Sequence, residues 1–196
     1  MRLLKIGLTG GIACGKSETL NYFKNTDWNT ISADEIVKDL LANDQETITT
    51  IIAKFGDDAL LKNSGSINRQ YLASRIFNNA EDKIWLENLI HPKVNKHWTT
   101  AIKLAPEKQW IIEIPLLFEK NLESQFDFSV CIFAPYNIQV KRLLARGLTK
   151  SDAKARIASQ LPLEAKLNKS DFSILNSGSH EFLRKQINQL KTHLSN

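Results

Sequence analysis

The 196-residue sequence predicts an α/β fold with a doubly wound, five-stranded parallel sheet. Three observations lead to this prediction. Short apolar runs alternate with segments of helical spacing, a glycine-rich loop follows the first run directly, and a long interval in the first half of the chain lacks a convincing strand. These observations indicate a sheet covered by helices on both faces, a tight strand-to-helix turn at its carboxyl edge, and a helical insertion.

Apolar, β-branched runs are expected to form the strands of the sheet. Each is bounded by turn or polar residues: Leu3–Leu8, Trp28–Ile31, Trp110–Ile114, Phe128–Phe133 and Phe172–Leu175. Such runs are typical of strands that are buried on both faces. A parallel sheet of this kind binds its ligand at the carboxyl ends of the strands, so residues that directly follow these runs are the first candidates for a functional site.

The first run leads into the loop Gly10–Ser17, which has the pattern G-x-x-x-x-G-K-S. In this pattern glycines let main-chain N–H groups point at phosphate oxygens, the lysine (Lys16) reaches the β- and γ-phosphates, and the serine hydroxyl (Ser17) ligates Mg²⁺. The segment Lys16–Asn25 is expected to form a helix, whose N-terminal partial charge favours anions. The loop therefore predicts a protein that binds ATP or GTP.

Residues 39–105 are expected to form an inserted helical subdomain. Their helical spacing predicts helices over Ile48–Phe55, Arg69–Phe77 and Lys83–Leu104. The dipeptide His91-Pro92 predicts a helix boundary or a kink within the last of these, because a residue before proline avoids the helical conformation.

Amphipathic spacing predicts the buried faces of the first and last helices. After the glycine-rich loop, Leu20 and Phe23 fall on one face. The last helix is expected over Glu181–Leu194. Its predicted buried side consists of Phe182, Ile187, Leu190 and Leu194.

Composition favours a cytoplasmic protein. The cysteines, Cys14 and Cys131, indicate neither a disulfide framework nor a metal site. The chain begins with a strand-like run instead of a signal peptide, and no apolar stretch approaches the roughly 18 residues of a membrane span.

The formal net charge is +5, with basic residues concentrated over residues 141–156 on a helix-turn-helix pattern. Because the chain has a phosphate loop, we expect these cations to meet nucleotide phosphate and not nucleic acid.

Further candidates lie next to strand ends and on the basic helix. Asp34 follows the second strand, where its carboxylate could accept a hydroxyl proton; the alternative is an N-cap for a helix that begins at Glu35. Glu113 closes the third strand and resembles the acidic residue that holds Mg²⁺ or its water molecules, with packing as the alternative. Arg142 and Arg146 share a helix face, from which two guanidinium groups could meet one anion; the alternative is a solvated face.

Two other patterns bear on the choice of nucleotide and metal. Asn168–Asp171 reads N-K-x-D, the pattern by which GTPases recognise guanine, but it precedes the last strand instead of following one, and the sequence lacks D-x-x-G. We therefore expect ATP. The histidines show no H-E-x-x-H or similar ligand spacing, so no catalytic metal other than Mg²⁺ is expected.

Several stretches of the chain resemble the dephospho-CoA kinase family, in the family's order and over nearly the whole length. They are Ile6–Ile12, Ser32–Lys38, Arg75–Phe77, His91–Val94, Pro115–Glu119, Gln139–Arg146, Arg156–Gln160 and Asp171–Gly178. The resemblance implies a fold of the P-loop kinase type and ATP-dependent phosphorylation of the ribose 3′-hydroxyl of dephospho-CoA. It also implies three parts: a nucleotide-binding core of residues 1–38, 106–138 and 161–196, a helical CoA-binding subdomain of residues 39–105, and a lid of residues 139–160.

The resemblance assigns roles to individual residues. Asp34 matches the catalytic carboxylate that accepts the hydroxyl proton, while Lys16, Arg142 and Arg146 neutralise charge during transfer. The ATP site would consist of Gly10, Gly11, Ile12, Ala13, Cys14, Gly15, Lys16, Ser17 and Glu18, with Asn176 near the adenine and Ser17 on the metal. The acceptor site would consist of Asp34, Arg75, His91, Leu116 and Glu119.

The loop departs from the family at Ala13 and Cys14, where Gly-Ser is usual. The Cβ of Ala13 predicts ordinary backbone angles there, and a thiol in the loop is a candidate for oxidation. Dephospho-CoA is the expected partner, with no nucleic acid or membrane, and a monomer or small homo-oligomer is expected. The alternatives are a kinase for another small metabolite and a nucleotide-dependent switch NTPase.

Overall fold

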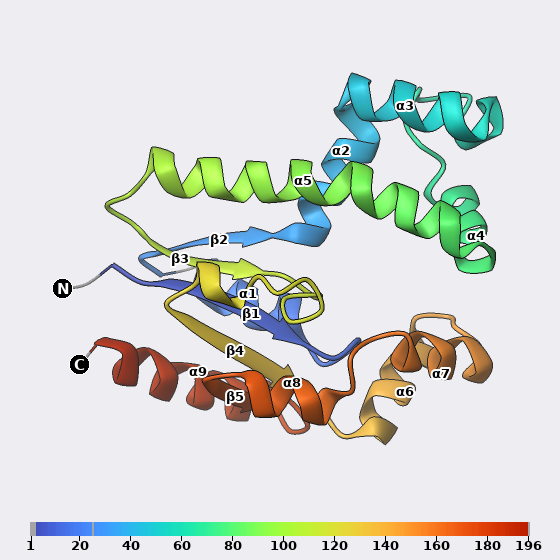
Figure 1. Ribbon diagram of the computed structural model, residues 1–196. Helices are drawn as coiled ribbons and strands as arrows, with labels where there is room; N and C mark the ends of the chain where they lie inside the picture. Colours follow the sequence, from blue (N-terminus) through green and yellow to red (C-terminus); the bar gives the residue numbers. More distant parts are fainter. Residues whose placement is uncertain (1–2, 25, 196) are drawn as a thin grey trace. The chain divides into compact units, whose positions relative to one another are not determined.

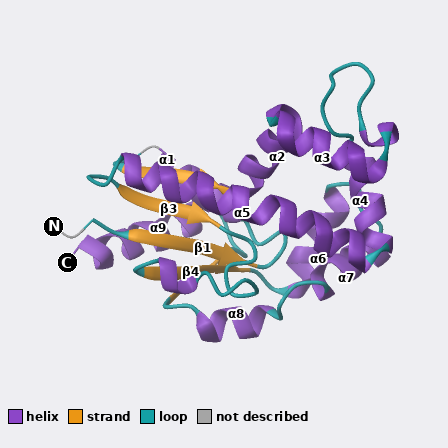
Figure 2. Ribbon diagram, turned by 45° about the horizontal axis from the view of Figure 1, so that its top comes forward, coloured by secondary structure: helices purple, strands orange, loops and turns teal. Residues whose placement is uncertain are grey.

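The computed structural model describes residues 3–24 and 26–195 (Figure 1). The chain divides into two compact units, one made of Met1–Ser32 with Ala105–Asn196, the other of Ala33–Leu104. Figure 2 shows that the strands belong to the first unit and that the second is built of helices and loops. Among the described residues, no helix combines the length and the apolar character needed to cross a membrane.

The first unit contains a parallel sheet with the strand order β2-β3-β1-β4-β5. Its strands are β1 (Lys5–Gly10), β2 (Trp28–Ser32), β3 (Gln109–Glu113), β4 (Phe128–Phe133) and β5 (Phe172–Leu175). Every predicted run forms a strand, which confirms the predicted fold class. β1 begins and ends two residues later than predicted, because Thr9 and Gly10 still pair with β4 although the apolar run stops at Leu8.

The helices of the first unit lie between and after the strands. They are α1 (Lys16–Lys24), the 3₁₀ turn η2 (Glu123–Gln125), α6 (Tyr136–Ala145), α7 (Lys150–Ala158), α8 (Leu163–Lys169) and α9 (His180–Ser195). Leu20 and Phe23 of α1 are buried on one face, as predicted, in a core shared with Ile6, Leu8 and Ile187. Asn25, the predicted last residue of the first helix, lies outside the described residues.

The buried face of α9 differs from the prediction at one position. Leu183, Ile187 and Leu190 are buried, whereas Phe182 is 44% exposed, so the assignment of Phe182 to the buried side is wrong. Leu183 lies one helical turn before Ile187 and therefore shares its face. Phe182 is turned away from that face by about 100°. Leu194 packs against the core, as predicted.

The opposite face of β1 is covered by the loop that follows β3. Successive residues of a strand point to opposite faces, so Gly7 and Thr9 face away from the core of Ile6 and Leu8. A Cβ at Gly7 would lie 3.1 Å from Leu117, and the Thr9 hydroxyl donates to the Pro115 carbonyl at 3.3 Å. This loop is therefore held directly beside the strand that leads into the phosphate loop.

The second unit is helical, as the sequence predicts. Its elements are α2 (Ala33–Asn43), α3 (Gln45–Phe55), the 3₁₀ turn η1 (Asp57–Ala59), α4 (Arg69–Asn78) and α5 (Ala80–Leu104). α3 and α5 each begin three residues before the predicted start. The reason is polar capping: the Asp44 side chain accepts the Thr47 N–H at 3.0 Å, and the Asn79 side chain accepts the Glu81 N–H at 2.9 Å.

α5 continues through Pro92, so of the two alternatives predicted at His91-Pro92, a helix boundary or a kink, the boundary is wrong. A proline inside a helix costs about 3 kcal/mol. Ile90, Val94 and Trp98 flank it on the same helix and are buried. Burial of each large apolar side chain contributes roughly 1.5–3 kcal/mol, which offsets the cost of one proline.

Candidate functional site

The phosphate loop Gly10–Ser17 connects the carboxyl end of β1 to the N-terminus of α1, as predicted. Gly10 has a φ of 147°, and a Cβ there would lie 2.1 Å from the Ile132 carbonyl oxygen. Gly15 has a φ of 98°, and a Cβ there would lie 2.0 Å from the Asn176 Nδ2 atom. Only glycine fits both positions, because a side chain would meet strained backbone angles and a steric clash together.

Ala13 adopts a left-handed conformation with a φ of 58°, so the prediction of ordinary backbone angles is wrong. This conformation costs an alanine roughly 1–2 kcal/mol. The Ala13 methyl group is buried in a small apolar cluster with Leu143 of α6 and Ala153 of α7. Packing from a distant part of the chain thus accompanies a backbone conformation that the local sequence does not favour.

Lys16 lies within the loop, with only 9% of its surface exposed. Its ammonium donates to the carbonyl oxygens of Gly10 at 3.3 Å and Gly11 at 3.1 Å. Ser17 is exposed in the first turn of α1, where main-chain N–H groups have no partner within the helix. An ammonium, a hydroxyl and the positive end of a helix dipole therefore meet in one loop, which is the chemistry of an anion site.

Cys14 is fully buried, contrary to the expectation that the loop thiol is open to oxidation. Burial raises the pKa of this thiol, and the nearby Lys16 charge lowers it to a lesser extent. Burial likewise raises the pKa of Cys131 to about 12. Since the thiolate is the reactive form, both cysteines are packing residues in this fold.

Arg142 on α6 contacts the phosphate loop. One guanidinium nitrogen donates to the Ala13 carbonyl at 3.1 Å, and another donates to the Asn176 Oδ1 at 3.3 Å. Arg146, four residues further on, caps the end of α6 and is exposed. Arg142 lies within α6 and Arg146 directly follows its last residue, and the structure brings Arg142 to the loop.

Asn176 follows β5 and supports the loop. It is 3% exposed, and its side-chain nitrogen donates to the Cys14 carbonyl at 3.0 Å and to Glu18 Oε2 at 3.3 Å. Glu18 also pairs with His180 at the start of α9. The amide of Asn176 therefore joins three groups: the loop backbone, the first turn of α1 and the Arg142 guanidinium.

The carboxyl ends of β2, β3 and β1 meet at one edge of the sheet. Ser32 pairs with Glu113, and Glu113 pairs with Leu8, just before the phosphate loop. Glu113 is 1% exposed. Asp34 follows Ser32 by two residues and is exposed in the first turn of α2. Because α2 begins at Ala33, Asp34 lies inside the helix and is not the N-cap of a helix starting at Glu35.

The predicted acceptor residues of the second unit lie on two helices. Arg75 of α4 is 3.6 Å from the buried carboxylate of Asp82, and its guanidinium lies 6.0 Å from the centre of the Phe55 ring. His91 is half-buried on α5. The sequence alone does not single out Asp82, because one acid in the first turn of a helix is an ordinary surface feature.

Sequence reasoning also gave no role to two residues that contact the phosphate loop or the loop after β3. The Gln160 Oε1 accepts the Ile12 N–H at 3.0 Å, and the fully buried Lys166 pairs with Glu119 at 2.8 Å. A signal for Lys166 was present, since it lies three residues after Leu163 and so on the same side of the helix, at a spacing typical of a buried stripe. A lysine in such a stripe indicates a partner elsewhere in the chain.

The N-K-x-D pattern lies at the end of α8 and before β5, as predicted. Its aspartate, Asp171, accepts hydrogen bonds from the Ser129 N–H at 2.7 Å and the Ser129 hydroxyl at 2.8 Å. Asp171 thus ties the start of β5 to β4 and serves the sheet.

Comparisons with known proteins point in the same direction as the site. The model of the dephospho-CoA kinase family matches residues 4–181. A dephospho-CoA kinase from Carboxydothermus hydrogenoformans is 39% identical over 186 residues, which cover 93% of this chain and 90% of that protein. A solved structure of dephospho-CoA kinase from Campylobacter jejuni matches with a TM-score of 0.73 and 32% identity, over 97% of this chain and 96% of that one. A crystal structure of a Thermus thermophilus protein matches with a TM-score of 0.82 and 27% identity, over 99% of each chain.

Proposed function

The chain belongs to the dephospho-CoA kinase family, and we propose that it transfers the γ-phosphoryl group of ATP to the ribose 3′-hydroxyl of dephospho-CoA. The products are coenzyme A and ADP, which makes this the last step of coenzyme A synthesis. The observation that carries the proposal is the phosphate loop Gly10–Ser17, with the Lys16 ammonium inside it and the Arg142 guanidinium bonded to it.

On the nucleotide side, the loop N–H groups and Lys16 would hold the ATP phosphates. The site fits Mg²⁺, because the Ser17 hydroxyl is an exposed oxygen ligand next to the phosphate-binding lysine. When bound, Mg²⁺ neutralises charge on the phosphate oxygens. Asn176 supports the loop from the end of β5, and we propose that the adenine lies near it.

In the transfer step, a bond forms between the 3′-oxygen and the γ-phosphorus, and the bond to the ADP oxygen breaks. Asp34 orients the hydroxyl and accepts its proton, a role open to an exposed carboxylate at this edge of the sheet. Arg142 and Arg146 stabilise the charge that spreads over the moving group. Arg142 now donates to neutral carbonyl oxygens, which are weaker acceptors than phosphate and can be exchanged for it.

We place the acceptor site at Asp34, Arg75, His91, Leu116 and Glu119. Arg75 has a half-exposed guanidinium that can meet an anionic group of dephospho-CoA. Glu119 has one carboxylate oxygen engaged by Lys166 and by the Leu161 N–H, so its contribution is the position of its loop. We further propose a cytoplasmic enzyme that works as a monomer or small homo-oligomer, with no nucleic-acid or membrane partner.

The test is an acceptor-dependent assay. The protein is incubated with Mg²⁺ and either ATP or GTP, with and without dephospho-CoA, and ADP or GDP formation is followed. We expect ADP to form at least about tenfold faster when dephospho-CoA is present, because transfer needs both substrates in place. The Lys16→Met variant should lose this activity and controls for contaminating enzymes.

Two results would contradict the proposal. Slow GDP formation without any acceptor would identify a switch NTPase. ADP formation that depends on another acceptor, such as a nucleoside monophosphate, but not on dephospho-CoA, would identify a different small-metabolite kinase.

A further inference from the structure

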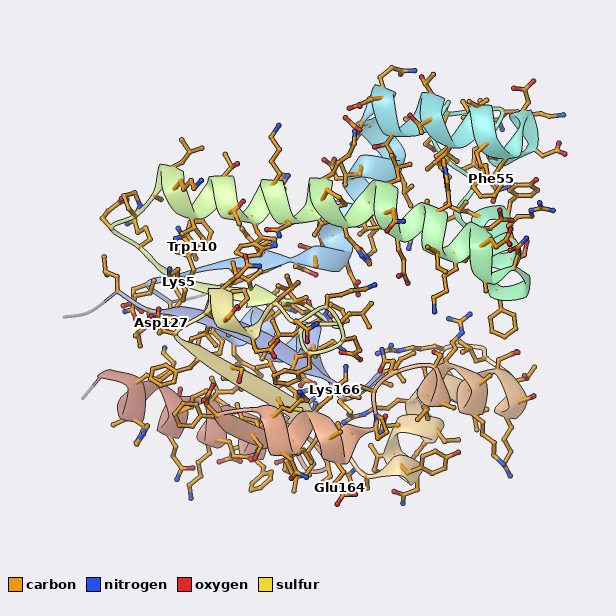
Figure 3. The ribbon with its side chains drawn as sticks, viewed as in Figure 1. Lys5, Phe55, Trp110, Asp127, Glu164 and Lys166 are labelled. Atoms are coloured by element: carbon orange, nitrogen blue, oxygen red, sulfur yellow. The ribbon has the colours of Figure 1, made fainter. Side chains whose placement is uncertain are left out.

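Lys166 is a fully buried cation that the proposed chemistry does not use. It lies on α8 with 0% of its surface exposed. Figure 3 shows it on the side of α8 that faces the interior of the first unit, while Glu164 of the same helix lies on the outer side. An ammonium buried away from water is unfavourable unless it is paired and hydrogen-bonded, so its partners determine what it does.

The ammonium of Lys166 contacts two residues of the loop that follows β3. Its Nζ lies 2.8 Å from Glu119 Oε1 and 2.8 Å from the Pro115 carbonyl oxygen. The Pro115 carbonyl also accepts the hydroxyl of Thr9, a buried residue directly before Gly10. Lys166 therefore holds the loop Pro115–Glu119 at both ends, beside the strand that enters the phosphate loop.

The same ion pair reaches the segment that joins α7 to α8. Glu119 Oε1, besides pairing with Lys166, accepts the Leu161 N–H at 3.1 Å. The preceding residue, Gln160, accepts the Ile12 N–H of the phosphate loop at 3.0 Å. Leu161 thus contacts the loop Pro115–Glu119, and its neighbour Gln160 contacts the phosphate loop. The Lys166 charge acts on the segment between α7 and α8 through Glu119.

We propose that Lys166 and Glu119 are positioning residues for phosphoryl transfer, whose ion pair holds the loop Pro115–Glu119 in register with the phosphate loop. This inference rests on the proposed function: it adds Lys166, and it explains how Glu119, already placed at the acceptor site, acts through the position of its loop. A displacement of about 1 Å between reacting groups can lower a rate roughly 100-fold, so loosening this loop will slow transfer. The amides and Lys16 that hold ATP stay in place.

The experiment compares Lys166→Met with two matched variants of the full chain. Lys169→Met removes an exposed lysine from the same helix. Ile187→Ala destabilises the core of the first unit at α9 without removing either member of the ion pair. Thermal midpoints are measured first, and kcat and both KM values are then determined well below the lowest midpoint.

We expect Lys166→Met to lower kcat/KM for dephospho-CoA at least about tenfold, with KM for ATP changed by less than about threefold. Lys169→Met should behave like the wild type. Ile187→Ala should lower the thermal midpoint without changing kcat/KM. If Lys166→Met also lowers only the midpoint, Lys166 is a stability residue and the inference is wrong.

Glu119→Gln provides a second test that does not depend on the folding of Lys166→Met, because glutamine keeps the shape and the oxygen that accepts the Leu161 N–H. We expect a smaller loss of kcat/KM for dephospho-CoA than in Lys166→Met, and wild-type kcat/KM in this variant would overturn the inference.

The double variant, which carries both substitutions, tests whether the two residues act as one unit. If they do, its kcat/KM is no lower than that of the worse single variant. If the two losses multiply, the residues act separately and the inference is wrong. Failure of the proposed function gives a different result, since the wild type itself would then form no acceptor-dependent ADP.

Discussion

Gly15 and Asn176 determine the shape of the phosphate loop together, although they lie at opposite ends of the chain. The side-chain nitrogen of Asn176 occupies the space that any Cβ at position 15 would need, and it donates to the carbonyl of the preceding residue, Cys14. The glycine of the motif is thus required here for contact with a side chain as well as for approach to phosphate.

The Gly15→Ala substitution tests this contact. The added Cβ would lie 2.0 Å from Asn176 Nδ2 at a φ of 98°, so the loop must move. We expect ATP affinity, measured by titration calorimetry, to fall at least about tenfold, because misplaced amides lose their phosphate contacts.

Gly56→Ala is the matched control for this prediction. Gly56 has a φ of 80°, and among the described residues no atom lies within 4 Å of the position that a Cβ would take, so alanine there brings the backbone cost without a clash. It should lower stability by roughly 1–2 kcal/mol and leave ATP affinity unchanged. Wild-type affinity in Gly15→Ala would contradict the role given to this contact.

Among the elements, α3 and α5 are joined by an ion pair at the start of α3. Asp44 caps α3 through the Thr47 N–H, and the Lys93 ammonium lies 2.8 Å from its Oδ2. The hydrogen bond from Lys93, followed by that from Thr47, lowers the pKa of Asp44 from 3.8 to about 2. The same pair raises the pKa of Lys93.

This shift predicts how the stability of the helical unit depends on pH. A carboxyl with a lowered folded pKa stabilises the fold above its unfolded pKa, and this contribution is lost as pH falls through the folded pKa. The difference in free energy of unfolding between wild type and Asp44→Asn should therefore have its full value above about pH 4 and decrease as the pH falls toward about 2.

Urea unfolding of both proteins at several pH values measures this difference. Asp58→Asn, at an exposed position in the same unit, is the control and should have little effect throughout. A difference between wild type and Asp44→Asn that stays constant from neutral to acid pH would show that the Lys93 pair contributes nothing.

Elements could be predicted from sequence where the apolar pattern decides them. All five predicted runs formed strands, since burial on both faces leaves a continuous apolar signal. Prediction was weaker where polar contacts or packing decide. The start of α3 depends on a cap, the passage of α5 through Pro92 depends on buried neighbours, and Leu183 replaces Phe182 because the core selects one face.

The residues of the candidate site likewise divide into those that a local pattern predicts and those that only the folded chain brings together. Lys16 and Ser17 could be found because the loop motif carries its chemistry within eight residues. The left-handed conformation of Ala13 could not be predicted, and the helical spacing around Lys166 indicates a partner without identifying it as Glu119, since each feature depends on residues that only the fold brings close. Short-range patterns carry no information on such contacts.

For the molecule as a whole, the proposed chemistry is divided between groups on different elements. The phosphate loop lies in the first unit, while Asp34 stands in the first turn of α2, two residues after β2 ends. The proposal therefore assigns nucleotide binding and proton acceptance to separate residues, and it predicts that a substitution removes one without the other.

The most direct test of this account is to measure ATP affinity and turnover together in Asp34→Asn, with the neighbouring exposed Glu35→Gln as control. Loss of a general base lowers turnover roughly 100- to 10,000-fold. We predict such a loss of kcat in Asp34→Asn, with a dissociation constant for ATP within about twofold of wild type. Wild-type turnover in this variant would contradict the account, because no proton acceptor would then be needed at position 34.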